Sequence, residues 1–344
     1  CLLARWGPES SVADFGLAEE LLDLCRELGD AELELLARNW RGTAFLELGD
    51  FTALEREIER IGEMAAELRQ PRAMAFVPLH RGMLAVTGGR FAEAERLNAE
   101  SLEIGRRVAG SVSQLAAYSQ LQLIRLHQGR LPELEDLVRG MLASYPEIVA
   151  LRCGLIALLL QADRPEEARV EFERVLGGGL GALPRNNTHI LVVALLGGAA
   201  VEFEDVPRAR VLYERLEPFR ARWVVAPSAC AVWPVERSLG QLAGAFGEVE
   251  LALSHLAAAR SRAEEADALP SLALVALDEA RILAARDGEG DAAAAARRAG
   301  DAHALGASLG MRRVADAAGA LARTLGAAGS PRPEPDVVAT LEHE

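Results

Sequence analysis

The sequence contains no lysine, so all 37 of its basic residues are arginine. A Walker A loop needs a lysine at the nucleotide phosphates, a protein kinase needs one on a strand, and Schiff-base enzymes need an amine nucleophile. These three enzyme classes are therefore excluded within this chain.

Aromatic residues are scarce, at 5%, whereas 50% of the 344 residues are hydrophobic and 26% are charged. A chain of this length and composition can bury a large core, and its many Ala, Leu and Glu residues favour helices over strands. We expect an all-α protein. The net charge of -14, with no arginine-rich run, would repel a phosphate backbone, so no nucleic-acid partner is expected.

The four cysteines form no C-x-x-C pair, and we expect reduced core residues in a cytoplasmic protein. The most apolar stretch, 190–201, is shorter than the ~20 residues of a membrane span. It is interpreted as a buried helix, with no membrane partner. The chain begins at Cys1 without a signal peptide, so we interpret it as a piece of a longer polypeptide.

No motif indicates catalysis, a cofactor or a metal site. The six histidines lie far apart, without the H-E-x-x-H spacing of a zinc site, and G-x-S-x-G and D-D-x-x-D motifs are absent. The glycine-rich segment 177–184 does not keep the spacing of a phosphate-binding loop. We therefore predict no catalytic, cofactor-binding or metal-binding residue in this chain.

An internal repeat is visible as seven turn-like sites spaced 34 to 43 residues apart. Their first residues are Gly49, Gly89, Gly129, Asp163, Glu204, Gly247 and Gly290. Seven residues before four of these turns stand Gly42, Gly82, Gly197 and Gly240, and five residues after five of them stand Ala94, Ala168, Ala209, Ala252 and Ala295. Small residues at fixed places on both sides of a turn predict two helices that cross closely.

This pattern resembles the tetratricopeptide repeat over roughly residues 35–310, most specifically in 82–94. The resemblance implies a right-handed α-solenoid of about seven helix hairpins over residues 1–328. A HEAT-like pairing of helices remains an alternative, because most units exceed 34 residues. Irregular connections are expected near 177–187 and 218–234, and the proline-containing segment 329–344 is expected to form a flexible tail.

A solenoid offers a concave wall, lined by the first helix of each pair, that can hold a peptide, a helix or another domain. The helical register places eight candidate binding residues on or beside this wall: Asn39, Thr43, Leu79, His80, Met83, Ser119, Gln120 and Leu123. The expected ligand is a protein, a peptide or a small-molecule inducer.

Residues 183–185, 209–219, 222–225 and 304–312 resemble the C-terminal repeat region of large bacterial signalling ATPases. In that family the repeats follow an ATPase module, with an adenylate or guanylate cyclase domain or a LuxR-type DNA-binding domain in some members. The resemblance implies a non-catalytic sensing domain that restrains or releases an intramolecular ATPase module. The alternatives are a free-standing adaptor that scaffolds other proteins and an enzyme built on an α-solenoid.

Overall fold

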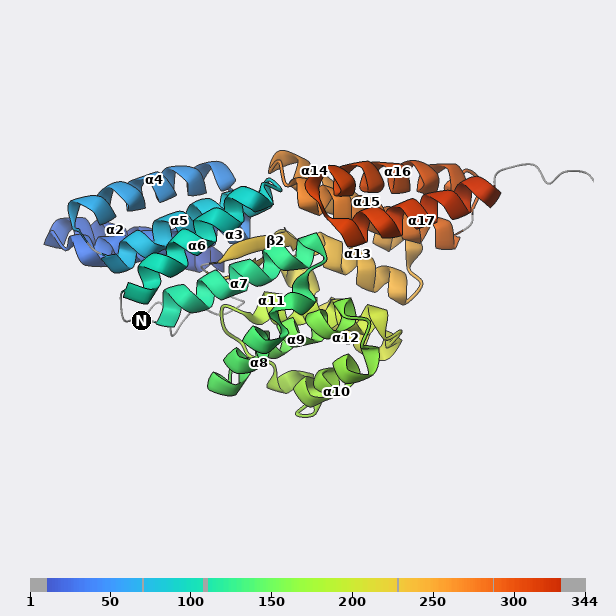
Figure 1. The fold of residues 1–344 in the computed structure, drawn as a ribbon, viewed down its shortest axis with the longest axis horizontal. Helices are drawn as coiled ribbons and strands as arrows, with labels where there is room; N and C mark the ends of the chain where they lie inside the picture. The colour runs from blue at the N-terminus through green and yellow to red at the C-terminus, as the bar shows by residue number, and fades with distance from the viewer. Residues whose placement is uncertain (1–10, 70, 108–110, 228, 287, 329–344) are drawn as a thin grey trace, which may run out of the picture.

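The computed structural model of the protein describes residues 11–69, 71–107, 111–227, 229–286 and 288–328. In these ranges the chain forms 16 α-helices, three short 3-10 helices and one two-stranded sheet, in a helical-repeat-like arrangement (Figure 1). The first half contains α2 (Ser11–Leu28), α3 (Ala31–Leu48), α4 (Phe51–Glu67), α5 (Pro71–Thr87), α6 (Phe91–Arg107), α7 (Ser111–Gln128), η1 (Leu131–Leu134), α8 (Glu135–Ser144), α9 (Val149–Gln161) and α10 (Pro165–Leu176).

The second half contains both strands and the remaining helices. They are η2 (Leu180–Ala182), α11 (His189–Glu202), α12 (Val206–Leu216), η3 (Glu217–Phe219), β1 (Trp223–Ala226), β2 (Cys230–Pro234), α13 (Val235–Ala245), α14 (Val249–Glu265), α15 (Leu269–Arg286), α16 (Asp291–Leu309) and α17 (Arg312–Ala328). The fold is therefore all-α apart from the sheet, as the composition predicts.

The predicted turns are confirmed. The first residue of each has a positive φ, between 55° and 84°, and each turn separates two helices. This left-handed conformation ends a helix, and glycine adopts it without steric cost. Asp50 then caps the next helix, because its carboxylate accepts a hydrogen bond from the Ala53 backbone N–H at 2.9 Å.

The close helix crossings are also confirmed. A Cβ atom at Gly240 would lie 2.7 Å from Cγ of Leu256, and one at Gly197 would lie 3.2 Å from Cδ1 of Leu242. The five predicted alanines, Ala94, Ala168, Ala209, Ala252 and Ala295, are all fully buried. The missing or small side chains thus let neighbouring helices pack at short range.

The connection 218–234 differs from the expected irregular segment, because most of it forms a buried β-hairpin. Strands β1 and β2 pair antiparallel, with a register irregularity between Val224 and Val225, and every described residue from 223 to 226 and from 229 to 234 is buried. The hairpin contacts α3, α5 and α7 of the first half and α11, α13, α14 and α15 of the second. A two-stranded hairpin is marginally stable alone, so these helices hold it in place.

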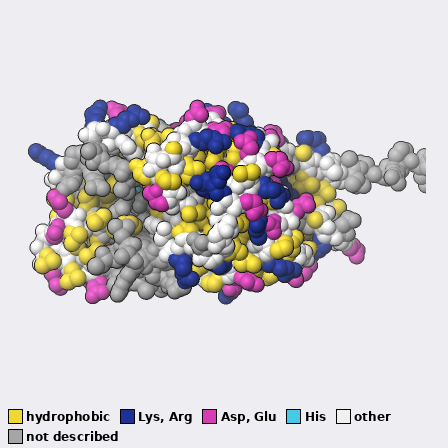
Figure 2. Space-filling model, turned by 90° about the horizontal axis from the view of Figure 1, so that it is seen from below, with side chains coloured by type: hydrophobic (Ala, Val, Ile, Leu, Met, Phe, Trp, Pro, Cys, Tyr) yellow, Lys and Arg dark blue, Asp and Glu magenta, His cyan; other side chains and the backbone are white. Residues whose placement is uncertain are grey.

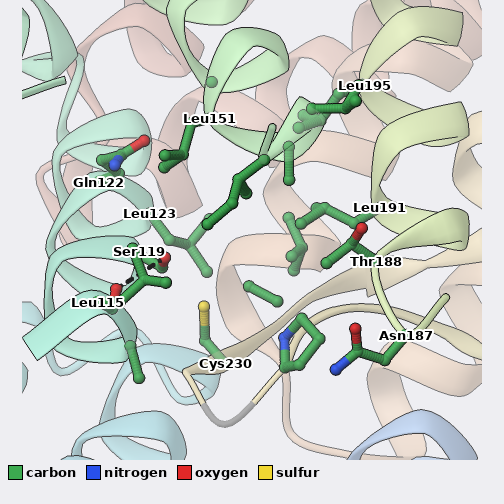
Figure 3. Close-up of a pocket in the computed structure, with 18 of the residues that line it drawn as sticks. Leu115, Ser119, Gln122, Leu123, Leu151, Asn187, Thr188, Leu191, Leu195 and Cys230 are labelled. Atoms are coloured by element: carbon green, nitrogen blue, oxygen red, sulfur yellow. Dashed lines mark hydrogen bonds between the residues drawn. The ribbon is translucent and has the colours of Figure 1, made fainter. Parts of the chain in front are cut away.

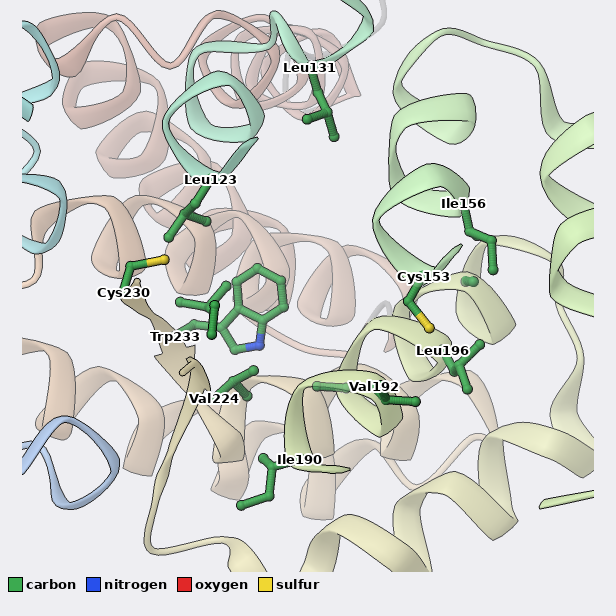
Figure 4. Packing of buried hydrophobic residues seen from close by; sticks show 14 of the residues in the cluster. Leu123, Leu131, Cys153, Ile156, Ile190, Val192, Leu196, Val224, Cys230 and Trp233 are labelled. Carbon is green, nitrogen blue, oxygen red and sulfur yellow. The ribbon is translucent and has the colours of Figure 1, made fainter. Parts of the chain in front are cut away.

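The main hydrophobic core joins the hairpin to the surrounding helices. Figure 4 shows Trp233 of β2 among side chains of α7, α9 and α11, with Leu123 on one side and Val192 on the other. The indole Nε1 of Trp233 donates to Oγ of Ser238 at 2.9 Å, which satisfies its polar atom inside the core. Helix α11 is buried on most of its surface, as the apolar run 190–201 predicts.

The end of the array also contacts its first half. A Cβ atom at Gly89 would lie 2.7 Å from Leu309 of α16, and Nη1 of Arg313 in α17 donates to the backbone oxygen of Gln161 at 2.8 Å. The last two helices therefore pack against the turns that follow α5 and α9.

Acidic and basic side chains are interspersed over the described part of the face in Figure 2. Many form ion pairs between neighbouring helices, including the buried pair of Arg237 and Asp278, 2.8 Å apart. None of the helices among the described residues combines the length and apolarity needed to cross a membrane. Cys25, Cys153 and Cys230 are free and buried, whereas Cys1 and the predicted tail 329–344 lie outside the described residues.

Candidate functional site

A cavity of about 490 Å³ lies between α7, α9, the start of α11 and the β-hairpin. Its volume falls within the usual range of small-molecule pockets. Figure 3 shows Leu115, Ser119, Gln122 and Leu123 of α7 on one side, Leu151 of α9 above, and Leu191 and Leu195 of α11 opposite. Cys230 of β2 closes the cavity from the hairpin side.

Most of the cavity wall is apolar, because each helix turns hydrophobic side chains toward the interior. The described apolar lining consists of Trp40, Leu115, Ala116, Leu123, Leu126, Leu131, Ile148, Val149, Ala150, Leu151, Ala157, Pro184, Leu191, Leu195, Ala226, Pro227 and Val232. Such a wall binds mainly by the hydrophobic effect, so polar groups at a few places set the orientation of a ligand.

Two hydroxyl groups of the lining already donate their protons within the protein. Oγ of Ser119 donates to the backbone oxygen of Leu115 at 3.0 Å, and Oγ1 of Thr188 donates to Oδ1 of Asn186 at 2.7 Å. Both hydroxyls can therefore offer only an acceptor to a bound molecule.

Gln122 differs, because its Nε2 atom is buried and has no hydrogen-bond partner among the described residues. Its side chain lies over Gly154 of α9, where a Cβ atom would come within 2.8 Å of the Gln122 Oε1 atom. The glycine thus makes room for an amide group at the cavity wall. The Gln122 Nε2 atom has almost no accessible surface, so it lies within the wall rather than open to the cavity.

Only two of the described lining residues are ionisable, Glu147 and Cys230. Glu147 is exposed, whereas burial raises the pKa of the Cys230 thiol and keeps it protonated and weakly nucleophilic at neutral pH. The described lining contains no histidine or arginine beside this thiol that could activate it. The arrangement therefore supports binding better than covalent chemistry.

Two of the eight predicted wall residues, Met83 and Gln120, contact the β-hairpin. Met83 belongs to a buried cluster with Trp223 and Val225, and Nε2 of Gln120 donates to the backbone oxygen of Ala229 at 2.9 Å. The six buried members of the set are Thr43, Leu79, His80, Met83, Gln120 and Leu123. At Met83 and Gln120 the predicted wall is thus covered by the protein's own β-hairpin.

Of the eight predicted residues, the structure brings Ser119 and Leu123 together in the cavity. Asn39 and Thr43 lie on α3, where the Thr43 hydroxyl donates to the Asn39 backbone oxygen at 3.4 Å. His80 is fully enclosed, its Nδ1 atom has no partner among the described residues, and burial lowers its pKa to about 4. These three residues do not line the cavity.

Gln122, Gly154 and the segment 186–188 also line the cavity, and none of them was predicted from the sequence. Gln122 follows Ser119 by three positions, which places both on the same side of a helix, so its position beside Ser119 was available from the sequence. Gly154 and Thr188 carry no such signal, because their nearness to α7 depends on the path of the chain between helices.

Among the described residues, no group of three or more His, Cys, Asp and Glu side chains is placed to hold a metal ion. No protein-family model matches the chain, and no curated protein matches it.

Proposed function

We propose that this chain is a non-catalytic helical repeat module that binds a small molecule in the cavity between α7, α9, α11 and the β-hairpin. The mostly apolar cavity of about 490 Å³, which is open on one part of its boundary, carries this proposal. A small molecule is favoured over an extended peptide, because the β-hairpin already covers the predicted wall at Met83 and Gln120. The array is a right-handed α-solenoid of about seven tetratricopeptide-like hairpins, and the module acts in the bacterial cytoplasm.

The position of the cavity suits a sensing role. Its wall includes Cys230 and Val232 of β2, and this strand also contacts α5 and α7 of the first half and α13 to α15 of the second. A ligand in the cavity would therefore change the packing of a segment shared by both halves. In a larger signalling ATPase or adenylate cyclase, such a change would restrain or release the catalytic module.

A cavity-filling substitution tests the binding role. Ala157 lies on the cavity wall, so Ala157→Phe places a ring in the space that a ligand needs. Ala99→Phe makes the same change at an exposed position of α6 and serves as the control. A small-molecule library is screened by thermal shift, since a ligand that binds only the folded state raises Tm.

We expect compounds that raise the Tm of the wild type and of Ala99→Phe but leave that of Ala157→Phe unchanged. The proposal fails if no compound behaves in this way, or if every active compound also stabilises Ala157→Phe. The role in a larger enzyme is tested separately by sequencing the gene upstream of the Cys1 codon. A P-loop encoded there would support this role, and a start codon adjacent to Cys1 would refute it.

The alternative is a free-standing adaptor that scaffolds other proteins. It is favoured by exposed leucines of the first helix pair, with Leu28 of α2 76% exposed and Leu36 of α3 49% exposed. Exposed apolar side chains that lie near each other are typical of surfaces that contact other proteins. A pull-down that depends on Leu28 and Leu36, but not on Ala157, would favour the adaptor.

A further inference from the structure

The loop before α11 places one free amide group at the cavity wall. Asn187 lines the cavity and is half-buried, and Figure 3 shows its side chain beside Thr188, on the same side of the cavity as Leu191. Its side-chain amide makes no hydrogen bond with the other described residues. Because neither Oδ1 nor Nδ2 belongs to the buried atoms without a partner, both atoms have accessible surface and can bind a molecule in the cavity.

The neighbours of Asn187 hold it in place. Oδ1 of Asn186 accepts hydrogen bonds from the backbone N–H of Thr188 at 3.0 Å and from its Oγ1 at 2.7 Å. The backbone N–H of His189 donates to the backbone oxygen of Asn186 at 2.9 Å, and Nδ1 of His189 donates to that of Pro184 at 2.7 Å. These hydrogen bonds fix the segment on both sides of Asn187, so its free amide is preorganised for a ligand.

No other described side chain of the lining offers both an accessible donor and an unoccupied acceptor. The hydroxyls of Ser119 and Thr188 donate within the protein and offer acceptors only. Oδ1 of Asn186 is occupied twice, and Nε2 of Gln122 has almost no accessible surface. A ligand amide can therefore form two hydrogen bonds with Asn187, one in each direction.

The charge of the wall restricts the ligand further. An anion would enter an apolar space with no described cation in its lining, and Glu147 would repel it. A cation would meet only the exposed carboxylate of Glu147, where an ion pair contributes little, and would lose its hydration in the apolar part of the cavity. A neutral molecule avoids both costs.

We propose that the cavity binds a neutral, largely apolar molecule that carries a primary carboxamide or a lactam, and that the Asn187 amide pairs with this group. Nδ2 of Asn187 donates to the carbonyl oxygen of the ligand, and Oδ1 of Asn187 accepts from its N–H. The apolar body of the ligand contacts the leucines of α7, α9 and α11. The inference rests on the proposed binding function and gives the ligand class of the same site.

Four naphthalenes with isosteric substituents test this inference. 2-Naphthamide donates and accepts, 2-acetylnaphthalene only accepts, 2-isopropenylnaphthalene does neither, and 2-naphthoate is an anion. Their affinities are measured by displacement of the neutral fluorescent probe N-phenyl-1-naphthylamine, with Ala157→Phe as the control for binding inside the cavity. Each measurement is repeated with Asn187→Leu, which removes the donor and the acceptor, and with Asn187→Asp, which removes only the donor.

The affinities are compared as ratios to that of the isopropenyl compound, which corrects for changes in the shape of the cavity. From the wild type to Asn187→Leu, we expect the relative affinity of the amide to fall about tenfold, as two hydrogen bonds predict, and that of the ketone about threefold. In Asn187→Asp the carboxylate accepts the N–H of the amide but repels the carbonyl oxygen of the ketone. The ratio of amide affinity to ketone affinity should therefore rise above its wild-type value.

An unchanged relative affinity of the amide in Asn187→Leu would overturn the inference. So would equal losses of the amide and the ketone in that variant, or an amide-to-ketone ratio that does not rise in Asn187→Asp. Tightest binding of the anion by the wild type, or no displacement by any of the four compounds, would overturn it as well.

This result is separable from the binding test above. If library compounds are blocked by Ala157→Phe but Asn187→Leu leaves the relative affinity of the amide unchanged, the binding function stands and the ligand class is wrong. If Ala157→Phe blocks no compound, the binding function itself is wrong. Thermal melts of both Asn187 variants verify that they fold.

Discussion

The side-chain amide of Gln120 on α7 donates a hydrogen bond to the backbone oxygen of Ala229, 109 residues later in the chain, at 2.9 Å. The same Nε2 atom donates to the backbone oxygen of Leu79 at 2.9 Å, and the Gln120 Oε1 atom accepts from Nδ2 of Asn98 at 3.1 Å. One fully buried amide thus connects three helices to the β-hairpin. Both N–H groups of this amide donate inside the protein, in contrast to the Nε2 group of Gln122 two residues later.

Gln120→Leu should destabilise the protein and loosen the hairpin. The substitution removes the donor to Ala229 and leaves a buried carbonyl and part of Asn98 unpaired, which costs about 1–3 kcal/mol of unfolding free energy. Urea denaturation measures the loss, and hydrogen exchange should become faster in β2. Gln122→Leu is the matched control, because Gln122 Nε2 has no described partner to lose. Equal losses in the two variants would contradict this account.

Much of this fold follows from local sequence signals. The turn at Gly49 requires a left-handed residue, and the crossing at Gly240 requires a missing side chain, so both are visible as small residues at a fixed spacing. Met83 of α5 and Gln120 of α7, two of the residues predicted from the helical register, are both buried.

The hairpin and the cavity could not be predicted in the same way. The two apolar runs at 223–226 and 230–234 flank Pro227, which is a hairpin signal, but a short hairpin forms only where other elements bury it. One of the residues that hold the hairpin, Gln120, lies 109 residues before its hydrogen-bond partner Ala229 in the chain. The pairing of Gln122 with Gly154 likewise depends on the packing of α7 against α9, for which neither residue carries a sequence signal.

Gly49→Ala should be more harmful than Gly29→Ala. Both glycines follow a helix with a positive φ, 78° and 67°, so each alanine incurs a similar backbone cost of about 1–2 kcal/mol. At Gly49 the new Cβ atom would also lie 2.4 Å from Nε1 of Trp223, whereas at Gly29 it meets nothing within 4 Å. The clash should add about 1–3 kcal/mol.

Thermal and urea unfolding of the two variants measure this difference. Hydrogen exchange in β1 should rise only in Gly49→Ala, because Trp223 begins this strand. Similar stability of the two variants would show that the turn after α3 does not support the hairpin.

Gly240→Ala and Gly300→Ala should change stability in opposite directions. At Gly240 in α13 the added Cβ atom would lie 2.7 Å from Leu256 and 3.1 Å from the backbone oxygen of Ala252, so overpacking should cost about 1–3 kcal/mol. Gly300 is exposed in α16 with no atom within 4 Å of the added group. There alanine should raise the unfolding free energy by about 0.5–1 kcal/mol through helix propensity.

The measurement is the unfolding free energy from urea denaturation at constant m value. A loss at Gly300 or no loss at Gly240 would mean that the spacing of small residues does not mark close helix crossings in this array.

Two buried histidines should make the protein less stable in mild acid. Burial lowers the pKa of His80 to about 4 and that of His127 to about 3, with a further contribution from Arg237 at His127. In the unfolded chain both histidines titrate near pH 6.5. Between pH 6.5 and about 4 the unfolded state therefore binds more protons than the folded state. The stability that the two neutral histidines contribute is present above pH 6.5 and is lost as the pH falls through this window.

Each histidine should contribute a slope of up to about 1.4 kcal/mol per pH unit in this window, or about 3 kcal/mol in total for the pair between pH 6.5 and pH 5. The comparison is between the wild type and the double variant His80→Gln/His127→Gln, since other groups, including Glu236 with its raised pKa, titrate in both proteins. Unfolding free energies at pH 7, 6 and 5 should show the wild type losing stability faster than the variant. Parallel pH profiles would show that these two histidines can be protonated in the folded state as easily as in the unfolded chain.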